Sequence, residues 1–353
     1  MPPITAMPPM ADCPLPWPAD ETVRLGHGSG GKLTQQLLTE LFLPGFDNPW
    51  LQQAHDATLL HVADQRLVFT TDSFVVQPLF FPGGDIGKLA VYGTVNDLAM
   101  AGARPLYLSC GFILEEGLPL ATLARVVDSM QQAARETGVH LVAGDTKVVE
   151  KGKGDGLYIN TSGIGVPECD RAICPQTIET GDAILLSGDI GRHGIAVMAR
   201  REGLKFDNPL LSDCGELFSP VNGLLAAELP VHCLRDLTRG GLATALVELA
   251  ESAGHSFALE ETAIPVSDAV QGACEMLGLD PLHVASEGRF IVFVPESHAD
   301  AALAVLSEHA ISAGACNIGR VLEGKKSQVI MKTLIGSERP LDRLPGEQLP
   351  RIC

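Results

Sequence analysis

Residues 80–103 read FFPGGDIGKLAVYGTVNDLAMAGA and join a glycine-containing turn to a long apolar segment. From Ile86 to Ala101 the apolar residues recur at helical spacing, which predicts a helix packed in a core. Asp97 lies near the end of this segment. A carboxylate in such surroundings is costly unless it caps a turn, pairs with another group or binds a cation. The segment therefore predicts a core helix and makes Asp97 a candidate ligand.

Two blocks of strands and helices are predicted around this helix. The first block, from Glu21 to Val166, has strand patterns at 66–76, 106–114 and 157–166, a second helix at 119–137, and a strand that enters a polar loop at 139–150. The second block, from about Thr177, has strand patterns at 182–191, 288–295 and 327–334, helices at 194–203 and 298–313, and a strand end, glycine turn and helix within 234–254. These blocks predict two α+β domains joined near residues 166–180.

The domain boundaries follow from these blocks and from the proline content. Residues 1–21 are proline-rich and are expected to form a disordered extension. The first domain is expected to span 22–168 and the second 169–335, with a flexible tail over 336–353. That tail contains Pro340, Pro345 and Pro350 among charged residues, a composition that stays extended and solvated.

The composition restricts the partners and the compartment. A net charge of −18 argues against binding nucleic acid or an anionic membrane, which need basic surfaces, but not against a phosphate ligand. None of the nine cysteines lies in a C-x-x-C pair, and most look like small buried apolar residues, as in a reducing cytosol. No apolar run is long enough to span a membrane, so we expect a cytoplasmic protein.

Four aspartates of the first block recur in one setting, beside an apolar segment and small or hydroxyl residues. They are Asp56 in HDAT, Asp72 in TTDS, Asp97 in NDLA and Asp145 in GDTK. Any one of them can simply cap a turn or a helix. Mg²⁺ is bound by a few carboxylates together with the phosphate oxygens of a nucleotide. The repeated setting therefore raises a metal–nucleotide site as the alternative to four separate caps.

Two glycine-rich turns are candidate phosphate contacts. The run Gly26–Lys32 nearly spells a phosphate-binding loop, but Leu33 occupies the hydroxyl position and no strand precedes it, so a true P-loop is rejected. It remains a candidate glycine lid with Lys32 as a charge, or an ordinary loop before a helix at 33–42. The turn Asp236–Gly241 could hold phosphate through its N–H groups and Arg239, or be a capped glycine turn.

Three side chains are candidates for catalysis. Glu287 in SEGR is either a general base or a solvated turn residue, and Lys147 in GDTK is either a surface charge or a cation that faces phosphate. Cys353 is the last residue of the chain. It is either a nucleophile on a flexible arm or an incidental cysteine at a frayed terminus.

Taken together, GHGSGGK, TTDS, FFPGGDIGKLAVYGTVNDLAMAGA, GDTKVVE, DLTRGG, SEGR and the terminal PRIC resemble one family. Their order is similar to that of the aminoimidazole-ribonucleotide-synthetase-like (PurM-like) ATP-binding superfamily and, within it, of the HypE family of hydrogenase maturation factors. The resemblance runs from Val23 to Cys353. Selenophosphate synthetase is also similar but carries a reactive Cys or Sec in its glycine loop, where this chain has His27 and Ser29.

The resemblance implies two PurM-like α/β domains and a homodimer whose first domains pair into a closed β-barrel. It implies that ATP and Mg²⁺ drive the dehydration of an S-carbamoyl group on the terminal cysteine to an S-cyanide, the cyanide ligand of the [NiFe]-hydrogenase iron. A HypF-like carbamoyltransferase would load the cysteine, and a HypC–HypD-like iron-carrying scaffold complex would accept the cyanide. The alternatives are a small-molecule kinase or synthetase of the superfamily (selenophosphate synthetase-like or thiamine-phosphate kinase-like) and a non-catalytic assembly scaffold.

The resemblance also implies roles for individual residues. Cys353, Glu287 and Lys147 would be catalytic, and Asp72, Asp97 and Asp145 would hold the metal, with Asp56 more peripheral. The residues expected at the nucleotide are Gly28, Gly30, Gly31, Lys32, Asp56, Asp72, Lys88, Asn96, Asp97, Gly144, Asp145, Thr146, Asp236 and Arg239.

Overall fold

The computed structural model describes residues 22–46, 48–53, 55–204, 210–324, 326–344 and 352–353. The extension predicted to be disordered, residues 1–21, lies outside them. Among the described residues, none of the helices combines the length and the apolar character that a bilayer crossing requires.

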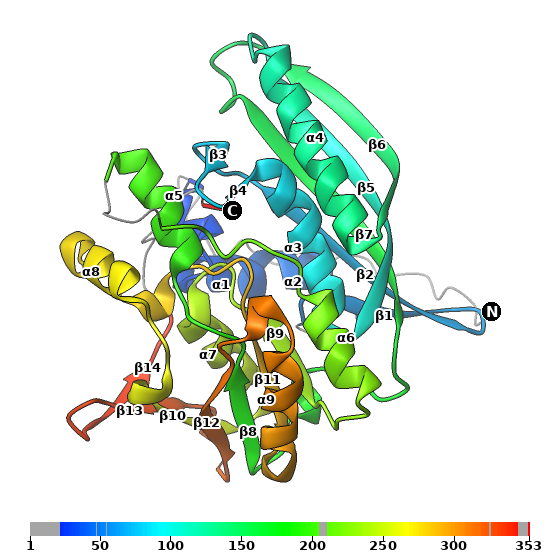
Figure 1. The fold of residues 1–353 in the computed structure, drawn as a ribbon. Coiled ribbons are helices and arrows are strands. Elements are labelled where there is room, and N and C mark those ends of the chain that lie inside the picture. Colours follow the sequence, from blue (N-terminus) through cyan, green and yellow to red (C-terminus); the bar gives the residue numbers. More distant parts are fainter. Residues whose placement is uncertain (1–21, 47, 54, 205–209, 325, 345–351) are drawn as a thin grey trace.

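The first domain is a five-stranded sheet with helices on one face (Figure 1). In spatial order its strands are β1 (Thr58–Val62), β2 (Gln65–Phe74), β7 (Leu157–Pro167), β5 (Ala103–Glu115) and β6 (His140–Val149). Neighbouring strands are antiparallel except β5 and β6, which run parallel. Helices α3 (Ile86–Met100) and α4 (Leu120–Thr137) cover the sheet, α3 packing directly on β2, β5 and β7.

Helix α3 is the helix predicted at 86–101, and it is buried on almost every side. The Asp85 carboxylate caps its first turn by accepting hydrogen bonds from the N–H groups of Gly87 and Lys88. One face of α3 packs on the five-stranded sheet, and the other packs on elements of the second domain, α6 (Phe218–Ala226) and β9 (Cys233–Asp236). Apolar residues on all faces of α3 are therefore needed, because the helix has no solvent side.

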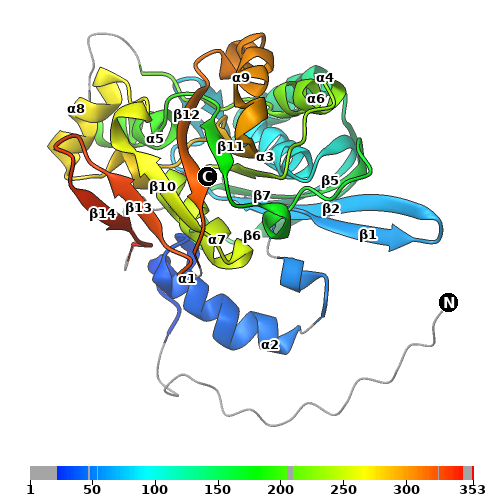
Figure 2. The same ribbon diagram turned by 90° about the horizontal axis from the view of Figure 1, so that it is seen from below.

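The opposite face of the five-stranded sheet carries exposed apolar side chains. All ten residues of β6 except Val149 are exposed. The large apolar residues of this sheet with more than a third of their surface exposed are Val62, Phe69, Tyr107, Ile113, Leu141, Val142, Val148 and Ile164. Leu141 and Val148 pair with Leu108 and Leu114 and therefore lie on the helix-bearing side of the edge strand β6. Figure 2 shows the β1–β2 hairpin projecting beyond the rest of the sheet.

The second domain is built on a seven-stranded sheet. In spatial order its strands are β14 (Glu338–Leu341), β13 (Val329–Lys332), β10 (Ser256–Glu260), β12 (Cys316–Leu322), β8 (Asp182–Leu186), β11 (Phe290–Pro295) and β9. Only β10 and β13 are parallel neighbours. Its helices are α5 (Arg192–Glu202), α6, α7 (Gly241–Ala253), α8 (Asp268–Leu277) and α9 (Ala299–Ser307). Helix α7 packs on β10 and β13, and α9 packs on β8, β11 and β12.

Shorter elements complete the described chain. Near the N-terminus, α1 (Lys32–Leu37) continues through a π-helical segment, Leu38–Phe42, into α2 (Leu43–Gly45), and β3 (Phe80–Phe81) and β4 (Gly84–Asp85) form a small hairpin. Single 3₁₀ turns lie at Leu25–Gly28, Leu51–Gln53, Pro175–Thr177, Glu261–Ala263, Pro281–His283, Glu296–His298 and Ala310–Ser312.

Two predictions of local structure differ from the observed fold. The GDTK motif was expected in a polar loop, but β6 continues through it because its residues pair with Cys110–Ile113 of β5. The tail from residue 336 was expected to be solvated, but β14 pairs with β13 at the edge of the second sheet. Proline is tolerated at that place because Pro340 lies on an edge strand.

Candidate functional site

A cavity of about 540 Å³ lies where the two domains meet. Residues of both domains form its wall, together with the glycine-rich segment near the N-terminus and the last two residues of the chain. The lining residues are Leu25, Gly28, Ser29, Gly31, His55, Asp56, Thr71, Asp72, Ser73, Val75, Asp97, Arg235, Asp236, Thr238, Arg239, Gly240, Thr244, His283, Glu287, Leu344, Ile352 and Cys353.

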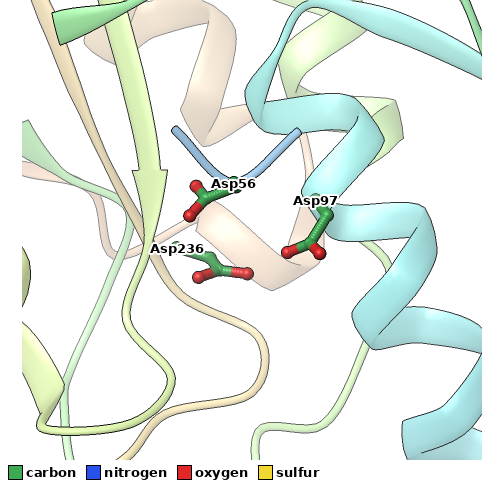
Figure 3. A group of neighbouring side chains, drawn as sticks. All are labelled: Asp56, Asp97 and Asp236. Atoms are coloured by element: carbon green, nitrogen blue, oxygen red, sulfur yellow. The ribbon is translucent and has the colours of Figure 1, made fainter. Parts of the chain in front are cut away.

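Three carboxylates converge in this cavity. Asp56 precedes β1, Asp97 is on α3 and Asp236 ends β9, and one oxygen atom from each lies within 4.8 Å of the others (Figure 3). Asp97 and Asp236 come together because α3 packs against β9 across the domain junction. Three buried carboxylates at this separation repel one another strongly unless protons or a cation compensate their charge.

The pKa values of the three carboxyl groups reflect their burial and this repulsion. Burial, followed by repulsion from Asp236, Asp56 and Asp72, raises the pKa of Asp97 well above its usual range. Burial and then Asp56 raise the pKa of Asp236 to about 8. Burial raises the pKa of Asp56 to about 6, although the Arg235 guanidinium, which is 2.9 Å from Asp56 Oδ1, opposes that shift.

Carboxylate oxygens of the cluster are available to bind a divalent cation. Asp56 Oδ2 is buried and has no hydrogen-bond partner among the described residues. Within the described residues, Asp97 receives a side-chain hydrogen bond at Oδ2, from the Thr70 hydroxyl at 2.7 Å, and none at its other oxygen. Hard cations such as Mg²⁺ take oxygen ligands of this kind. The donor set therefore suits a cation that Asp56, Asp97 and Asp236 would hold.

The glycine loop and the Asp236–Gly241 turn meet at the cavity. Gly30 has a φ of +79°, and a Cβ atom there would lie 3.2 Å from the backbone oxygen of Arg239. Only glycine permits both this backbone conformation and this close approach. Gly28, Gly31 and Arg239 line the cavity, so a mainly acidic wall has a basic side as well.

Glu287 is a buried carboxyl group in the wall. Only 4% of its surface is exposed, and Oε1 has no hydrogen-bond partner among the described residues. Burial, followed by repulsion from Asp236, Asp72 and Asp213, raises its pKa well above the usual range. The alternative of a solvated turn residue is therefore wrong for Glu287.

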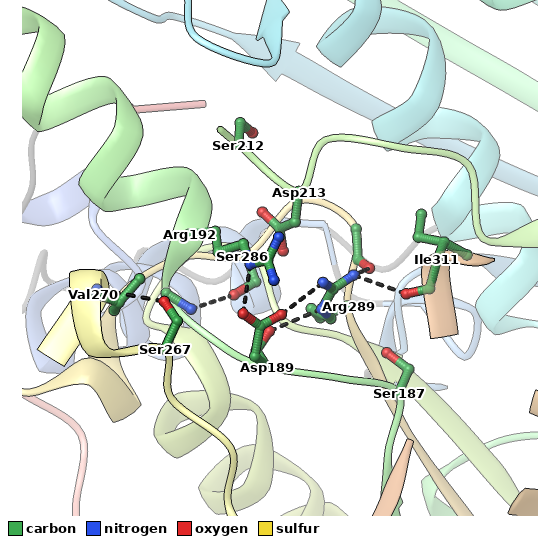
Figure 4. A network of polar contacts seen from close by, with 12 residues as sticks. Ser187, Asp189, Arg192, Ser212, Asp213, Ser267, Val270, Ser286, Arg289 and Ile311 are labelled. Carbon is green, nitrogen blue, oxygen red and sulfur yellow. Dashed lines mark hydrogen bonds and ion pairs between the residues drawn. The ribbon is translucent and has the colours of Figure 1, made fainter. Parts of the chain in front are cut away.

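A polar network behind Glu287 fixes the position of its backbone (Figure 4). The buried Arg289 guanidinium forms an ion pair with Asp189 at 2.8 Å and donates hydrogen bonds to the carbonyl oxygens of Gly288 and Ile311. The N–H group of Glu287 donates to Asp213 Oδ1 at 3.3 Å. This network holds the SEGR segment rigidly against the cavity.

The end of the chain lies inside the cavity. Ile352 is buried among core residues of the first domain, and the N–H group of Val75 donates to a main-chain carboxylate oxygen of Cys353 at 3.0 Å. Burial, followed by repulsion from Glu287, raises the pKa of the Cys353 thiol above its usual range. The expectation of a flexible, solvated tail is wrong for its last two residues, because residues of both domains line the cavity that holds Ile352 and Cys353. Residues 345–351 of the predicted tail lie outside the described residues.

Several predicted site residues lie elsewhere in the described part of one chain. The predicted residues that do not line the cavity are Gly30, Lys32, Lys88, Asn96, Gly144, Asp145, Thr146 and Lys147. The Asn96 amide is buried and joins the domains, accepting a hydrogen bond from the N–H group of Leu217 and donating one to the Gly215 carbonyl oxygen. Asp145 is exposed on β6 and forms an ion pair with Lys147 at 2.5 Å. The carboxylates gathered in one chain are thus Asp56, Asp97 and Asp236, with Asp72 in the same wall.

Some residues of the site were not predicted from the sequence. Arg235 pairs with Asp56 and with Glu248, His55 lines the cavity, and His193 contacts the chain end. Arg235 directly precedes Asp236 in the DLTRGG region, and its place beside a buried acid was the signal available for it.

Two family models match the chain. The N-terminal domain model of AIR synthase related proteins matches residues 54–167, and the C-terminal domain model matches residues 179–332. The fold and the matches together show that this is a two-domain protein of the AIR synthase related class.

More similar relatives narrow the class. The carbamoyl dehydratase HypE of Cupriavidus necator is 52% identical over 332 residues, covering 94% of this chain and 95% of the relative. The chain belongs to the HypE family of carbamoyl dehydratases, and the family indicated by its motifs is confirmed. A crystal structure of a HypE–HypF complex has a TM-score of 0.82 at 45% identity and covers 87% of this chain and 99% of that one. A crystal structure of HypE in complex with ATP has a TM-score of 0.79 at 49% identity, covering 93% and 98%.

Replacing Asp236 by Asn should change how stability depends on pH in the presence of EDTA. The raised pKa means that folded Asp236 keeps its proton where the unfolded chain loses it. The stability contributed by this proton is fully present below about pH 4 and is lost as the pH rises through about 8. At pH 9 Asp236→Asn should therefore exceed the parent protein in unfolding free energy by on the order of 5 kcal/mol, and at pH 5 by only on the order of 1 kcal/mol.

Urea unfolding followed by circular dichroism at both pH values measures this difference. Asp300→Asn, at an exposed position of α9, is the matched control and should show no change. An equal effect of Asp236→Asn at pH 5 and pH 9 would contradict the charge repulsion described for the cluster.

Proposed function

We propose that this protein uses ATP to dehydrate an S-carbamoyl group on its own Cys353 to an S-cyanide, which supplies the cyanide ligand for the iron of [NiFe]-hydrogenase. One observation carries the proposal: Cys353 shares a cavity with the acidic cluster and with the buried carboxyl of Glu287. An incidental cysteine at a frayed terminus would not be expected to lie in a cavity between the two domains. Membership of the HypE family supports the same reaction.

The chemistry requires an activated oxygen. The amide oxygen of the S-carbamoyl group attacks the γ-phosphorus of ATP, the bond to ADP breaks, and one N–H proton leaves. Loss of the second N–H proton then forms the C≡N bond and expels phosphate, which is a far better leaving group than hydroxide. Water must be excluded during these steps because it would hydrolyse the phosphorylated group.

The chain's own residues supply the remaining requirements. Asp56, Asp97 and Asp236 would hold Mg²⁺, which when bound neutralises charge on the transferred phosphoryl group. Arg239, on the turn that meets the glycine loop, supplies a fixed positive charge to the same wall. Ile352 fills the apolar space behind Cys353 and keeps water from the thiol.

Glu287 is the proposed base for the N–H protons. With its pKa raised, it holds a proton while the acidic cluster is uncompensated. Two of the charges that raise this pKa belong to Asp236 and Asp72, so cation binding beside them lowers it toward the range of a working base. The base would therefore become active only when the site is loaded.

The roles predicted for Gly144, Asp145, Thr146 and Lys147 require a second copy of the chain. These residues lie on β6 and do not line the cavity of their own chain. We propose that two chains pair through the exposed apolar face of the five-stranded sheets, forming a closed β-barrel, and that each β6 then reaches the nucleotide of its partner. Closing the barrel would also pair the exposed edge strands of the two sheets.

Two protein partners complete the cycle. A HypF-like carbamoyltransferase would load Cys353, in line with the HypE–HypF complex of a related protein. A HypC–HypD-like scaffold that carries iron would accept the cyanide. A small-molecule kinase or synthetase is less well supported, because the chain's own end fills part of the cavity where a second substrate would bind. A non-catalytic scaffold leaves the buried acidic cluster without a role.

Removing the thiol or the base should stop the reaction at different stages. Cys353→Ala should acquire no carbamoyl adduct from the carbamoyltransferase and ATP, since the carrier atom is gone. Glu287→Gln should acquire the adduct but lose water at least ~100-fold more slowly, the usual range for a missing general base. Intact-protein mass over time measures both steps. Loading of Cys353→Ala, or dehydration of Glu287→Gln at the parent rate, would refute the corresponding role.

Neutralising Asp97 should weaken Mg²⁺-dependent nucleotide binding by at least ~10-fold, because the cation loses a charged ligand. Calorimetric titration of Asp97→Asn with ATP, with and without Mg²⁺, measures this loss. The exposed Asp300→Asn serves as the control and should bind as the parent does. Parent-like affinity of Asp97→Asn in Mg²⁺ would exclude the proposed ligand set.

The sheet face predicts a dimer at micromolar concentration. Light scattering should give about 75 kDa, which is twice the chain mass of 37.3 kDa. Tyr107→Lys, on the exposed sheet face, should shift the protein toward the monomer because it places a charge in the interface. Val127→Lys, at a similarly exposed apolar position of α4, should remain dimeric. A monomeric parent protein would exclude the barrel.

A further inference from the structure

Hydrogen bonds from both domains, together with apolar packing, hold the last two residues of the chain. The Val75 N–H group of the first domain donates to a main-chain carboxylate oxygen of Cys353 at 3.0 Å. The His193 ring of the second domain lies with Nε2 2.6 Å from the Ile352 carbonyl oxygen. The Ile352 side chain is 6% exposed and packs in an apolar cluster. Figure 1 shows the chain end beside α5 and the β3–β4 hairpin.

The contacts of His193 assign its tautomer. A carbonyl oxygen only accepts, so Nε2 must carry the hydrogen that is donated to Ile352. Nδ1 is then an acceptor, and the Ser212 hydroxyl, 2.9 Å away, donates to it. The Ser212 oxygen in turn accepts from the N–H group of Cys214 at 3.0 Å. Each group in this chain of bonds has one consistent role.

The surroundings fix the ring in this orientation. His193 is fully buried in the first turn of α5, and its ring stands edge-on to Phe81 at a centroid distance of 5.2 Å. Burial lowers the pKa of His193, which favours the neutral ring that this bonding requires. Asp213 is the charged group that opposes this shift. The Nε2–H group thus points at the Ile352 carbonyl with little freedom to turn away.

We propose that His193 is a positioning residue that docks the chain end: its Nε2–H group holds the Ile352 carbonyl and thereby keeps the loaded Cys353 in the cavity during dehydration. This inference rests on the proposed function for its role in the reaction, but the docking itself does not. Cys353 is only partly exposed and lies in the cavity between the domains, so the bond that holds Ile352 would break before a partner enzyme loads the thiol. His193 therefore shifts the equilibrium between the docked and the undocked chain end toward the docked state.

This role predicts opposite effects on the two halves of the cycle. Without the donor, the docked state loses one hydrogen bond and the ratio of docked to undocked chain ends falls by about tenfold, the scale of a typical net hydrogen bond. Dehydration, which needs the docked state, should slow. Loading, which needs the undocked state, should proceed at least as fast as in the parent protein. A residue that only supported the fold would slow both steps together.

The test compares His193→Phe, which keeps a planar ring but removes the donor, with His193→Gln, whose amide N–H can still donate. Alkylation by iodoacetamide, followed peptide by peptide with mass spectrometry, reports exposure of the Cys353 thiol without any use of ATP. Cys169, a partly exposed cysteine far along the chain, is the internal reference for general loosening. Loading and loss of water are followed by intact mass with the carbamoyltransferase and Mg²⁺–ATP.

We expect Cys353 in His193→Phe to be alkylated about tenfold faster, with Cys169 unchanged, loading not slower, and loss of water slower by a much smaller factor, because the docked state dominates in the parent protein. His193→Gln should lie close to the parent protein in all four readouts. Parent-like alkylation of Cys353 in His193→Phe overturns the docking role, as does faster alkylation of Cys169 and Cys353 together. If the alkylation pattern holds but the loaded parent protein never loses water, docking stands and the proposed function fails.

Discussion

The packing of α3 between the two domains is the constraint on which the rest of the structure depends. One face of this helix lies on the sheet of the first domain and the other on α6 and β9 of the second. The Asn96 amide adds hydrogen bonds to the segment that precedes α6. Because the helix is fixed on both sides, Asp97, the residue after Asn96, lies close enough to Asp236 at the end of β9 for both to bind one cation. The domain junction and the acidic cluster are thus one feature.

The cluster shows why such a junction needs a ligand. Burial raises the pKa values of Asp56, Asp97 and Asp236, so without a cation the site must take up protons or tolerate repulsion. Arg235 compensates only part of this charge, since Glu248 shares it. A structure that keeps uncompensated carboxylates in its interior gives up stability that ligand binding restores. The site is therefore less stable empty than loaded, as expected for one that acts on a charged nucleotide.

The sequence was sufficient for features that depend on local pattern. The helical spacing from Ile86 to Ala101 predicted α3, and the alternation of the strand at 157–166 predicted β7. Motif order was enough to indicate the family. Strands such as β10 and β12 were not predicted, because short buried strands lack a clear alternation and are stabilised by neighbours distant in the chain.

The site was less predictable than the fold. Asp56 and Asp97 are cluster members that the sequence grouped together, whereas Asp236 was predicted only in a phosphate-binding turn. Asp145 was grouped with Asp56 and Asp97 because its motif looked alike, but its strand lies at the edge of the sheet away from the cavity. The enclosed position of Cys353 could not be read from a proline-rich segment either. Two hydrogen bonds, one from each domain, hold the chain end, and neither Val75 nor His193 belongs to a recognisable motif. Ser212 acts only through the His193 ring.

The covalent attachment of Cys353 has a kinetic consequence. Only nine positions separate Leu344, in the cavity wall, from Cys353, so the reacting group is confined near its site at an effective concentration on the order of millimolar. The cavity then needs no affinity for a free carbamoyl compound, and diluting the protein does not slow the chemical step. Occupancy of the cavity is then set by an equilibrium within one molecule and not by the concentration of a free substrate. Small metabolites that resemble the carbamoyl group compete poorly, because the attached substrate cannot diffuse away.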